Sequence, residues 1–416
     1  MTNSNPSTSP RTIRAADLDQ PRPIYVVWEI TLRCDHACDH CGSRAGPARD
    51  DELDTQELLA VADALIGLGT REVTLIGGEA YLRSDVYELV EHLAAAGVRV
   101  TMQTGGRGLT AARARRLRDA GLAAIGVSLD GTAAVHDTLR ASPGSHDAAL
   151  RAIEHGRAAG LLVSANTQVN RLNMGELPAI AAELEGAGAS IWRAHLTVPM
   201  GRAADRPEWI IQPYMVLEII DSLAAIQAEL DARPEPADFR VTLGNNLGYY
   251  GPHEQRLRAR PNQRDRYFSG CQAGRYVMGI ESDGVIKGCP SLPTAPYTGG
   301  NVRDLKLEDI WRDAPELRFT RERTTDELWG RCAGCYYAEL CRAGCSFTVH
   351  TTLGRRGNNP YCYYRADKLR REGLRELLVH ARRAPGEPYD FGVFELREEP
   401  WSNEPPTLPR SLPIVS

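Results

Sequence analysis

The feature that most constrains the fold is a regular alternation of short apolar runs and longer helical patterns between about residues 24 and 196. The runs are rich in β-branched residues, and several of the helical stretches end at glycine, which favours a left-handed helix cap. Six strand-then-helix units in succession predict a parallel sheet with right-handed crossovers, either an open doubly wound sheet or a partial barrel. The six runs are IYVVWEIT, EVTLIGG, VRVTMQT, AAIGVSLD, LLVSANTQV and ASIWRAHLTV.

Unusual residue clusters follow the first four of these runs. CDHACDHC comes after the first run, GGE after the second and TGG after the third, and SLDG contains the end of the fourth. In both architectures ligands bind beyond the C-terminal ends of the strands. We therefore expect these clusters to meet at one rim of the sheet and to form a ligand site there.

Composition and charge narrow the classes of protein. The chain has 416 residues, 42% hydrophobic and 25% charged, which predicts two or three globular domains and excludes a fibrous or wholly disordered chain. A formal charge of −5 gives no general attraction to nucleic acid or anionic lipid. The sequence has no apolar run near the roughly 20 residues of a membrane span, and its polar opening does not resemble a signal peptide. We expect a cytoplasmic protein with no nucleic-acid or membrane partner.

Ten cysteines need an explanation, because a reducing cytosol disfavours structural disulfides and favours metal ligation. Three of them, Cys34, Cys38 and Cys41, lie on the short loop after the first predicted strand. A structural zinc site takes four ligands, and His36 or His40 could complete a Cys and His set. A cubane iron–sulfur cluster held by three thiolates would instead keep one iron open for a substrate or cofactor. The loop by itself leaves both alternatives open.

The spacing Cys34-x3-Cys38-x2-Cys41, preceded by WEITLR, resembles the signature of the radical S-adenosylmethionine (SAM) superfamily. The resemblance implies that the three cysteines hold a [4Fe-4S] cluster whose open iron binds the amino and carboxylate groups of SAM. It further implies reductive cleavage of SAM to methionine and a 5′-deoxyadenosyl radical, which abstracts hydrogen from an unactivated carbon.

The segment Gly77-Gly78-Glu79 resembles the GGE motif of the same family. In the family this motif holds the SAM amino group, since glycine permits close approach and a carboxylate suits an ammonium. Ala80 stands where the family usually has proline, a departure that affects loop stiffness more than ligand chemistry.

Three further segments follow in the order that the family predicts. Ser128 and Asp130 of VSLDG match polar positions that approach the SAM ribose. His136-Asp137-x-x-Arg140 resembles an HDxxR segment, in which Arg140 is expected to be a carboxylate or structural partner at the cofactor site. Gln103-Thr104-Gly105 stands where many members of the family have a Thr-Asn-Gly turn, so this segment adds little to the resemblance.

The other seven cysteines lie together near the C-terminus. Their spacing closely resembles that of the SPASM extension, which carries two auxiliary iron–sulfur clusters. The competing interpretation of these cysteines is a zinc ribbon. By resemblance, Cys332, Cys335, Cys341 and Cys362 hold the outer cluster completely. Cys271, Cys289 and Cys345 hold the inner one, whose fourth ligand is open. The full expectation is SAM and three [4Fe-4S] clusters. VPMGRA at 198–203 resembles the PxGRA segment that precedes such extensions.

The expected architecture is a partial (β/α)6 TIM-like barrel followed by a smaller cysteine-rich SPASM domain. Two basic runs, 112–120 and 368–383, are interpreted as solvated helix faces. The predicted segments are a flexible N-terminus at 1–23, the barrel at 24–235, a bridging region at 236–270, the SPASM domain at 271–383 with its final helix over 365–383, and a Pro-rich tail at 384–416.

The resemblance implies maturation of a ribosomally made peptide or protein by oxidation or crosslinking, with an electron donor such as flavodoxin or ferredoxin. Only about twenty polar residues precede the first strand, so a leader peptide would need a separate leader-binding protein or another surface. The alternative is dehydrogenation or epimerisation of a small molecule such as a sugar or antibiotic precursor. Sulfatase maturation is disfavoured, because Pro290 stands where those enzymes have a general-base aspartate.

No catalytic acid or base is assigned from the sequence. Alternation along the sixth run places Trp192 on the opposite face from Arg193 and His195. This predicts core packing for the tryptophan and leaves cavity lining open for the other two.

Overall fold

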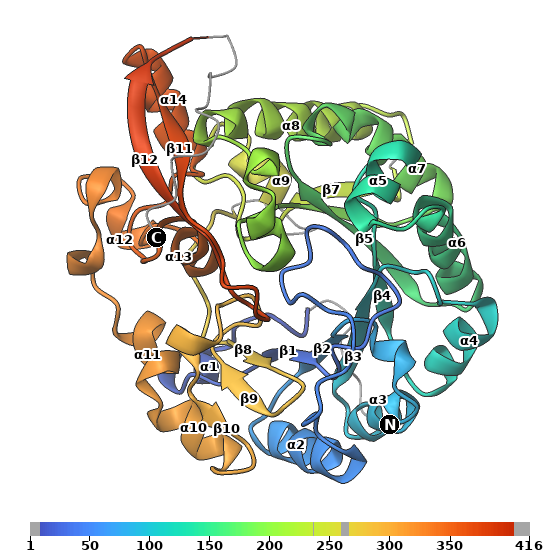
Figure 1. Ribbon diagram of the computed structural model, residues 1–416. Helices are drawn as coiled ribbons and strands as arrows, with labels where there is room; N and C mark the ends of the chain where they lie inside the picture. The colour runs from blue at the N-terminus through green and yellow to red at the C-terminus, as the bar shows by residue number, and fades with distance from the viewer. Residues whose placement is uncertain (1–8, 236, 259–265, 403–416) are drawn as a thin grey trace.

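The computed structural model describes residues 9–235, 237–258 and 266–402 (Figure 1). A curved sheet runs through it in the order β10-β9-β8-β1-β2-β3-β4-β5-β6-β7, and neighbouring strands from β8 through β1 to β7 pair in parallel. The six predicted strands are present, and the α/β class with a partial barrel is confirmed. They are β1 (Tyr25–Glu29), β2 (Glu72–Ile76), β3 (Arg99–Thr104), β4 (Ala124–Ser128), β5 (Leu162–Val169) and β6 (Ile191–Leu196).

Helices cover the outer face of this sheet (Figure 1). They bury the apolar side chains that alternate strands turn outward, such as Val163 and Ala165 of β5 and Trp192 of β6. The core therefore lies between the sheet and its ring of helices. The helices are α2 (Thr55–Gly67), α3 (Val86–Ala95), α4 (Ala111–Asp119), α5 (Ala133–Arg140), α6 (Ser145–Ala158), α7 (Leu177–Ala187) and α8 (Val216–Asp231).

The predicted bridging region contributes to the barrel. Strand β7 (Arg240–Leu243) pairs in parallel with β6, and helix α9 (Glu254–Arg258) follows it. At the other edge β8 (Val277–Ile280) pairs in parallel with β1, and β9 (Val285–Lys287) and β10 (Gly300–Asn301) extend the sheet in antiparallel fashion. The cysteine-rich region is thus joined to the barrel through one continuous sheet.

The C-terminal region corrects two expectations. The predicted helix over 365–383 is wrong beyond α14 (Tyr363–Arg371), because Gly373 has a φ of +74° and ends it. Residues after this glycine form β11 (Leu374–Arg382), which pairs with β12 (Val393–Pro400) inside the predicted unstructured tail. Residues 403–416 of that tail lie outside the described residues. The other helices here are α10 (Leu307–Asp313), α11 (Pro315–Glu322), α12 (Ala338–Cys341) and α13 (Ser346–Leu353).

The N-terminal expectation of a flexible segment at 1–23 is wrong from residue 9 onward. Helix α1 (Ala15–Asp19) lies against the barrel, where Asp17 accepts a hydrogen bond from Arg71 at 2.6 Å. Arg11 reaches the start of β2 and contacts Glu72, with its guanidinium 3.5 Å from the centre of the Tyr25 ring. Residues 1–8 lie outside the described residues.

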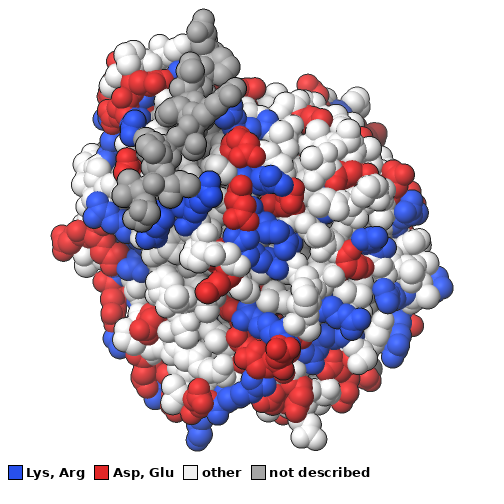
Figure 2. Space-filling model, in the orientation of Figure 1, with Lys and Arg blue, Asp and Glu red and all other residues white. Residues whose placement is uncertain are grey.

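One described helical stretch, Pro207–Asp231, is long and apolar enough to cross a membrane by length and composition. Over half of its most apolar window is buried, and it includes α8, which packs against α7, β7 and α14. This packing is that of a core helix. Positive and negative side chains are interspersed over the face shown in Figure 2.

Candidate active site

The cysteine loop and the GGE motif are held together by backbone hydrogen bonds. Gly78 N–H donates to the Thr31 carbonyl and Glu79 N–H to the Arg33 carbonyl, both at 2.8 Å. A Cβ added to Gly77 or Gly78 would lie 2.2 Å from one of these carbonyl oxygens. The glycines, expected from sequence to admit a ligand, are therefore required for the approach of the loop that carries the cysteines.

The three N-terminal thiols are grouped on that loop. Cys38 is buried, and Cys34 and Cys41 are partly exposed. Burial raises the pKa of Cys34 to about 12, and Glu79 and the two neighbouring thiols act in the same direction, so the three sulfurs lie within electrostatic reach of one another. A cation bound among them would reverse this effect, because metal ligation requires deprotonated cysteine.

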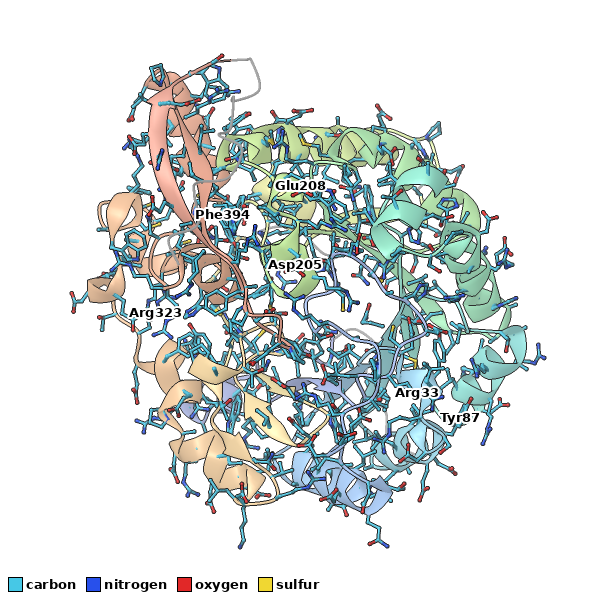
Figure 3. The ribbon with its side chains drawn as sticks, in the orientation of Figure 1. Arg33, Tyr87, Asp205, Glu208, Arg323 and Phe394 are labelled. Carbon is cyan, nitrogen blue, oxygen red and sulfur yellow. The ribbon has the colours of Figure 1, made fainter. Side chains whose placement is uncertain are left out.

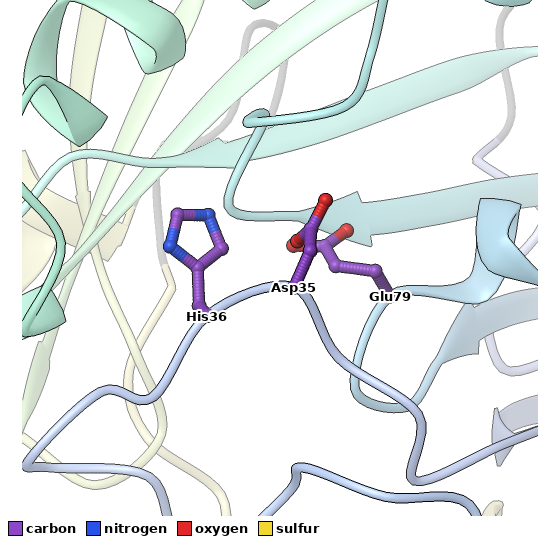
Figure 4. Close-up of side chains that lie close together, drawn as sticks. All are labelled: Asp35, His36 and Glu79. Carbon is purple, nitrogen blue, oxygen red and sulfur yellow. The ribbon is translucent and has the colours of Figure 1, made fainter.

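The Glu79 side chain points toward Asp35 of the cysteine loop (Figure 4). Its carboxylate accepts hydrogen bonds from Thr104 Oγ1 and from the Gly105 N–H, both at 2.6 Å, and burial raises its pKa to about 8. Ligand atoms of Asp35, His36 and Glu79 lie within 4.8 Å of one another. Both His36 ring nitrogens are buried without a partner among the described residues. Polar groups therefore gather beside the thiols, which suits an ammonium or carboxylate ligand.

The TGG turn after β3 is a site component that sequence reasoning undervalued. Thr104 and Gly105 fix the Glu79 carboxylate, and Gly106 N–H donates to Thr104 Oγ1 at 2.9 Å. The signal was present in its position, since TGG follows the third strand at the same rim as the other motifs.

Asp130 and Arg140 form an ion pair behind the cysteine loop. Arg140 Nη2 donates to Asp130 Oδ2 at 2.5 Å, and Nη1 lies 3.7 Å from Cys38 Sγ. His40 Nε2 contacts the same carboxylate oxygen at 3.1 Å. Burial opposes ionisation of Asp130, but Arg140 and His40 outweigh it and hold its pKa below the ordinary range. The structure therefore commits Asp130 to protein partners, with Arg140 placing positive charge beside a thiol.

His40 and Ser128, two further residues near the rim, differ in their hydrogen bonding. His40 Nδ1 contacts the Leu139 carbonyl at 3.0 Å, so both of its ring nitrogens are occupied by protein groups. This leaves His40 unsuited to complete a zinc site. Ser128 ends β4 on the inner face, is partly exposed, and has no hydrogen bond from its hydroxyl within the described ranges.

Four cysteines of the C-terminal region line one cavity of about 480 Å³. The cavity is also lined by Tyr250 and Tyr337, whose rings stack with centres 4.1 Å apart. The four cysteines are Cys332, Cys335, Cys341 and Cys362, the same set that the resemblance assigns to the outer cluster.

The size of this cavity bears on which group fits it. A structural zinc ion is enclosed by sulfurs at about 2.3 Å, leaving no free volume around the ion. A water molecule takes roughly 30 Å³, so a cavity of about 480 Å³ has room for a group of many atoms. A volume of this size, lined by four thiols, has room for an iron–sulfur cluster.

The remaining three thiols form a separate group. Burial raises the pKa of Cys289 to about 12, with Cys271 and Cys345 the next contributors, so these three sulfurs are electrostatic neighbours. Arg323, labelled in Figure 3, is buried nearby and lies within electrostatic reach of Cys271. The structure thus separates the seven cysteines into groups of four and three. The fourth ligand of the inner group stays open.

Residues 386–392, which we call the strap, connect β11 to β12 and were missed by sequence reasoning. Asp390 Oδ1 accepts from Arg44 Nε at 2.9 Å, and Arg44 also binds Asp205, labelled in Figure 3. The Asp390 carbonyl accepts from Gly201 N–H at 2.8 Å. Arg44 follows the third cysteine of the loop, and Gly201 belongs to the PMGRA segment. The contacts of Asp390 with these two residues therefore attach the strap to the cysteine loop.

A buried polar network lies under the strap. Tyr389 donates a hydrogen bond to Glu29, the last residue of β1, and the Lys287 ammonium lies 3.8 Å from the centre of the Tyr389 ring. Arg49 pairs with Glu29 at 3.3 Å and with Glu281 at 2.7 Å. Burial raises the pKa of Glu29 to about 7, although Arg49 opposes the shift. The network joins the rim of the barrel to the strand that precedes Cys289.

Comparisons with known families match two parts of the chain. Residues 28–183 match the sequence model described as the radical SAM superfamily. Residues 271–336 match that of SPASM, an iron–sulfur cluster-binding domain.

Among curated relatives, the AdoMet-dependent heme synthase of Oleidesulfovibrio alaskensis is 30% identical over 368 residues, covering 86% of this chain and 91% of its own. Mycofactocin maturase MftC of Mycobacterium ulcerans is 32% identical over 358 residues, covering 85% of this chain and 91% of its own.

Solved structures share the fold. Streptococcus suis SuiB bound to S-adenosylmethionine superposes with a TM-score of 0.65 at 15% identity, covering 84% of this chain and 78% of that one. The enzyme anSMEcpe with bound AdoMet and the Kp18Cys peptide superposes with a TM-score of 0.65 at 15% identity, covering 83% of this chain and 94% of that one.

Proposed function

Because the chain belongs to the radical SAM superfamily and carries a SPASM iron–sulfur cluster-binding domain, we propose that it modifies a ribosomally made peptide by radical oxidation or crosslinking. The observation that carries the proposal is the separation of ten cysteines into three groups, one on the barrel rim and two in the C-terminal region. The groups hold three, four and three thiols, which match the sets expected for the SAM-binding, outer and inner clusters, and the inner set leaves one ligand position open.

The roles proposed for individual residues follow from their positions. Cys34, Cys38 and Cys41 hold the SAM-binding cluster, and the auxiliary clusters take the sets of four and three described above. When bound, this cluster and SAM supply the radical chemistry that removes hydrogen from an unactivated carbon. Glu79, already oriented by Thr104 and Gly105, receives the SAM ammonium.

Other groups of the chain shield and orient this chemistry. Arg140 places its guanidinium 3.7 Å from Cys38 Sγ, which favours the thiolate needed for ligation. The strap is attached to the loop by the hydrogen bond from Arg44 to Asp390, which holds the loop in place. An electron donor such as flavodoxin or ferredoxin supplies electrons, and the aromatic-lined cavity of the outer group is lined in part by Tyr336, which is 86% exposed.

Relatives support the substrate class. MftC is named as a maturase, and SuiB has been solved with its precursor peptide SuiA. The heme synthase relative, similar over as much of the chain, favours a second candidate in which the substrate is a small molecule. Both candidates use the same cysteines and SAM site, and they differ only in what enters the barrel.

Co-expression tests the substrate class. The short reading frames beside the gene are expressed with the enzyme, and each peptide is examined by mass spectrometry for loss of two mass units or another defined shift. A shift that is lost with the Cys38→Ala variant supports peptide maturation. Unmodified peptides, together with neighbouring genes for sugar or nucleotide enzymes, would favour the small-molecule candidate.

A further inference from the structure

The inner face of the barrel carries polar side chains with partial solvent exposure on β5 and β6. Along β5 the outward side chains are buried, whereas Ser164, Asn166 and Gln168 on the inner face are partly exposed. Strand β6 repeats the pattern, with Trp192 buried and Arg193 and His195 partly exposed. Closed barrels fill their interior with packed side chains, so inner residues reached by solvent indicate a space that a ligand can enter.

Arg193 is the cation of this inner face that has no counter-ion. Its guanidinium makes no hydrogen bond or ion pair with any residue in the described part of the chain. Besides burial, Arg11 lowers the pKa of Arg193 by charge repulsion, whereas Tyr25 and Glu72 act in the opposite direction. Glu72 is already shared between Arg11 and Arg99, the latter at 3.5 Å. Two arginines therefore already engage the Glu72 carboxylate, which forms no ion pair with Arg193.

This charge imbalance costs free energy in the absence of a ligand. Burial and Arg11 lower the pKa of Arg193, which shows that the protein environment disfavours its charged form. A charge with limited access to water is ordinarily paired, and an unpaired guanidinium with its planar fork of donors matches a carboxylate in bidentate geometry. An incoming anion would satisfy Arg193 and relieve its repulsion with Arg11.

The side chains above Arg193 are polar and uncharged. Asn166 lies opposite Arg193 in the register of β5 with β6, and Gln168 lies opposite His195. Burial lowers the pKa of His195 to about 4, so its imidazole is neutral near pH 7. The Gln168 amide makes no side-chain hydrogen bond with the residues described here. The Asn166 amide already donates to Gln103 Oε1 at 2.6 Å, so the Gln168 amide is the neighbour that can hydrogen-bond a ligand without competing for its negative charge.

We propose that Arg193 binds a carboxylate of the substrate inside the barrel, so that the substrate is a molecule bearing a free carboxylate. For a peptide, this group is either the C-terminal carboxylate or an aspartate or glutamate side chain. The proposal rests on the proposed function in that it assumes a substrate entering the barrel below SAM.

The depth of Arg193 fits an extended substrate. Arg193 lies three residues before the end of β6, which places its Cα about 10 Å below the rim at roughly 3.3 Å per residue. The rim carries Glu79 and the cysteine loop. A substrate anchored through its carboxylate can therefore extend past His195 and Gln168 and present a carbon at the rim, where SAM is expected.

A labelling experiment tests the binding site without requiring turnover. Phenylglyoxal modifies accessible arginines in the anaerobically reconstituted enzyme, and mass spectrometry quantifies each site with 3-phenylpropanoate or its neutral analogue 3-phenylpropanamide present. The acid should protect Arg193 at least tenfold more than the amide, while exposed Arg115 on α4 is labelled equally throughout. Equal labelling of Arg193 with acid and amide would overturn the proposal.

A second experiment uses the peptide identified by co-expression. With Arg193→Gln, the KM for the peptide should rise about 30-fold or more. Arg193→Lys should raise this KM by less, and the surface control Arg115→Gln should keep the KM of the parent enzyme. Amidating the peptide C-terminus, or replacing its acidic side chains with amides, distinguishes the two carboxylate sources. The source that binds Arg193 is the one whose neutralisation reproduces the Arg193→Gln defect.

The outcomes separate this inference from the proposed function. If the parent enzyme yields no 5′-deoxyadenosine, the proposed function is wrong, whatever the labelling shows. If the parent enzyme modifies the peptide and every neutralised peptide keeps the parent KM, the carboxylate inference is wrong. A loss of SAM affinity in Arg193→Gln as large as the loss of peptide affinity would also overturn it, because Arg193 would then serve SAM. Melting temperatures of both glutamine variants establish that they are folded.

Discussion

Replacing Gly78 with alanine tests whether the GGE glycines exist to admit the cysteine loop. The added Cβ would lie 2.2 Å from the Arg33 carbonyl oxygen and 2.6 Å from that of Leu32. Heavy atoms in contact sit about 3.5–4.0 Å apart, so the loop must retreat by more than about 1 Å. Overpacking of this kind costs about 1–3 kcal/mol, and a shift of about 1 Å at a reacting centre can cost about 100-fold in rate.

The assay is 5′-deoxyadenosine formation with dithionite in anaerobically reconstituted protein, together with SAM affinity and iron content. We expect Gly78→Ala to lose about 100-fold in SAM cleavage and a few degrees in melting temperature. Gly67→Ala is the matched control, because an added Cβ there meets nothing within 4 Å. SAM cleavage by Gly78→Ala at the rate of Gly67→Ala would refute the steric argument.

Three further predictions concern the surroundings of the site. The pKa of Glu29 is about 7 in the folded protein and about 4.5 in the unfolded chain, so the folded protein keeps this proton to a higher pH. The free energy of unfolding should therefore fall by up to about 3 kcal/mol as the pH rises from about 4.5 to about 7. Glu29→Gln should flatten this slope in urea titrations at several pH values, and an unchanged slope would contradict the assignment. Asp390→Ala should release the strap from Arg44 and increase hydrogen exchange at 386–392, whereas exposed Glu387→Ala should leave exchange as in the parent. Cys341→Ser should remove roughly four iron atoms per chain, and full retention of iron and sulfide would argue against its role as a ligand.

The barrel was predictable because its signals are local and repeated. Apolar runs separated by amphipathic helices fix a parallel sheet, and motifs after successive strands must then meet at one rim. The cysteine spacing carried the resemblance to the family, and it was this resemblance that implied the groups of three, four and three. The relative placement of Glu79, Asp130 and the cysteine loop followed from the same topology.

The sequence did not predict contacts that join distant segments. The run at 368–383 has leucines at helical spacing, but Gly373 divides it and the second half pairs with residues near 400. The interaction of Asp390 with Arg44 spans 346 residues, and a single sequence carries no local signal for it. Asp130 was predicted to face a ribose, whereas its carboxylate is occupied by Arg140 and His40, a partnership visible only once the helix after β4 is placed.

The most direct test is the triple variant Cys34→Ala, Cys38→Ala and Cys41→Ala, prepared without oxygen beside the parent protein. We predict a brown parent with iron and sulfide far above zinc that cleaves SAM to 5′-deoxyadenosine. The triple variant should form none while keeping the absorbance and iron of the auxiliary clusters. Continued cleavage by the triple variant, or a colourless zinc-containing parent, would contradict the account.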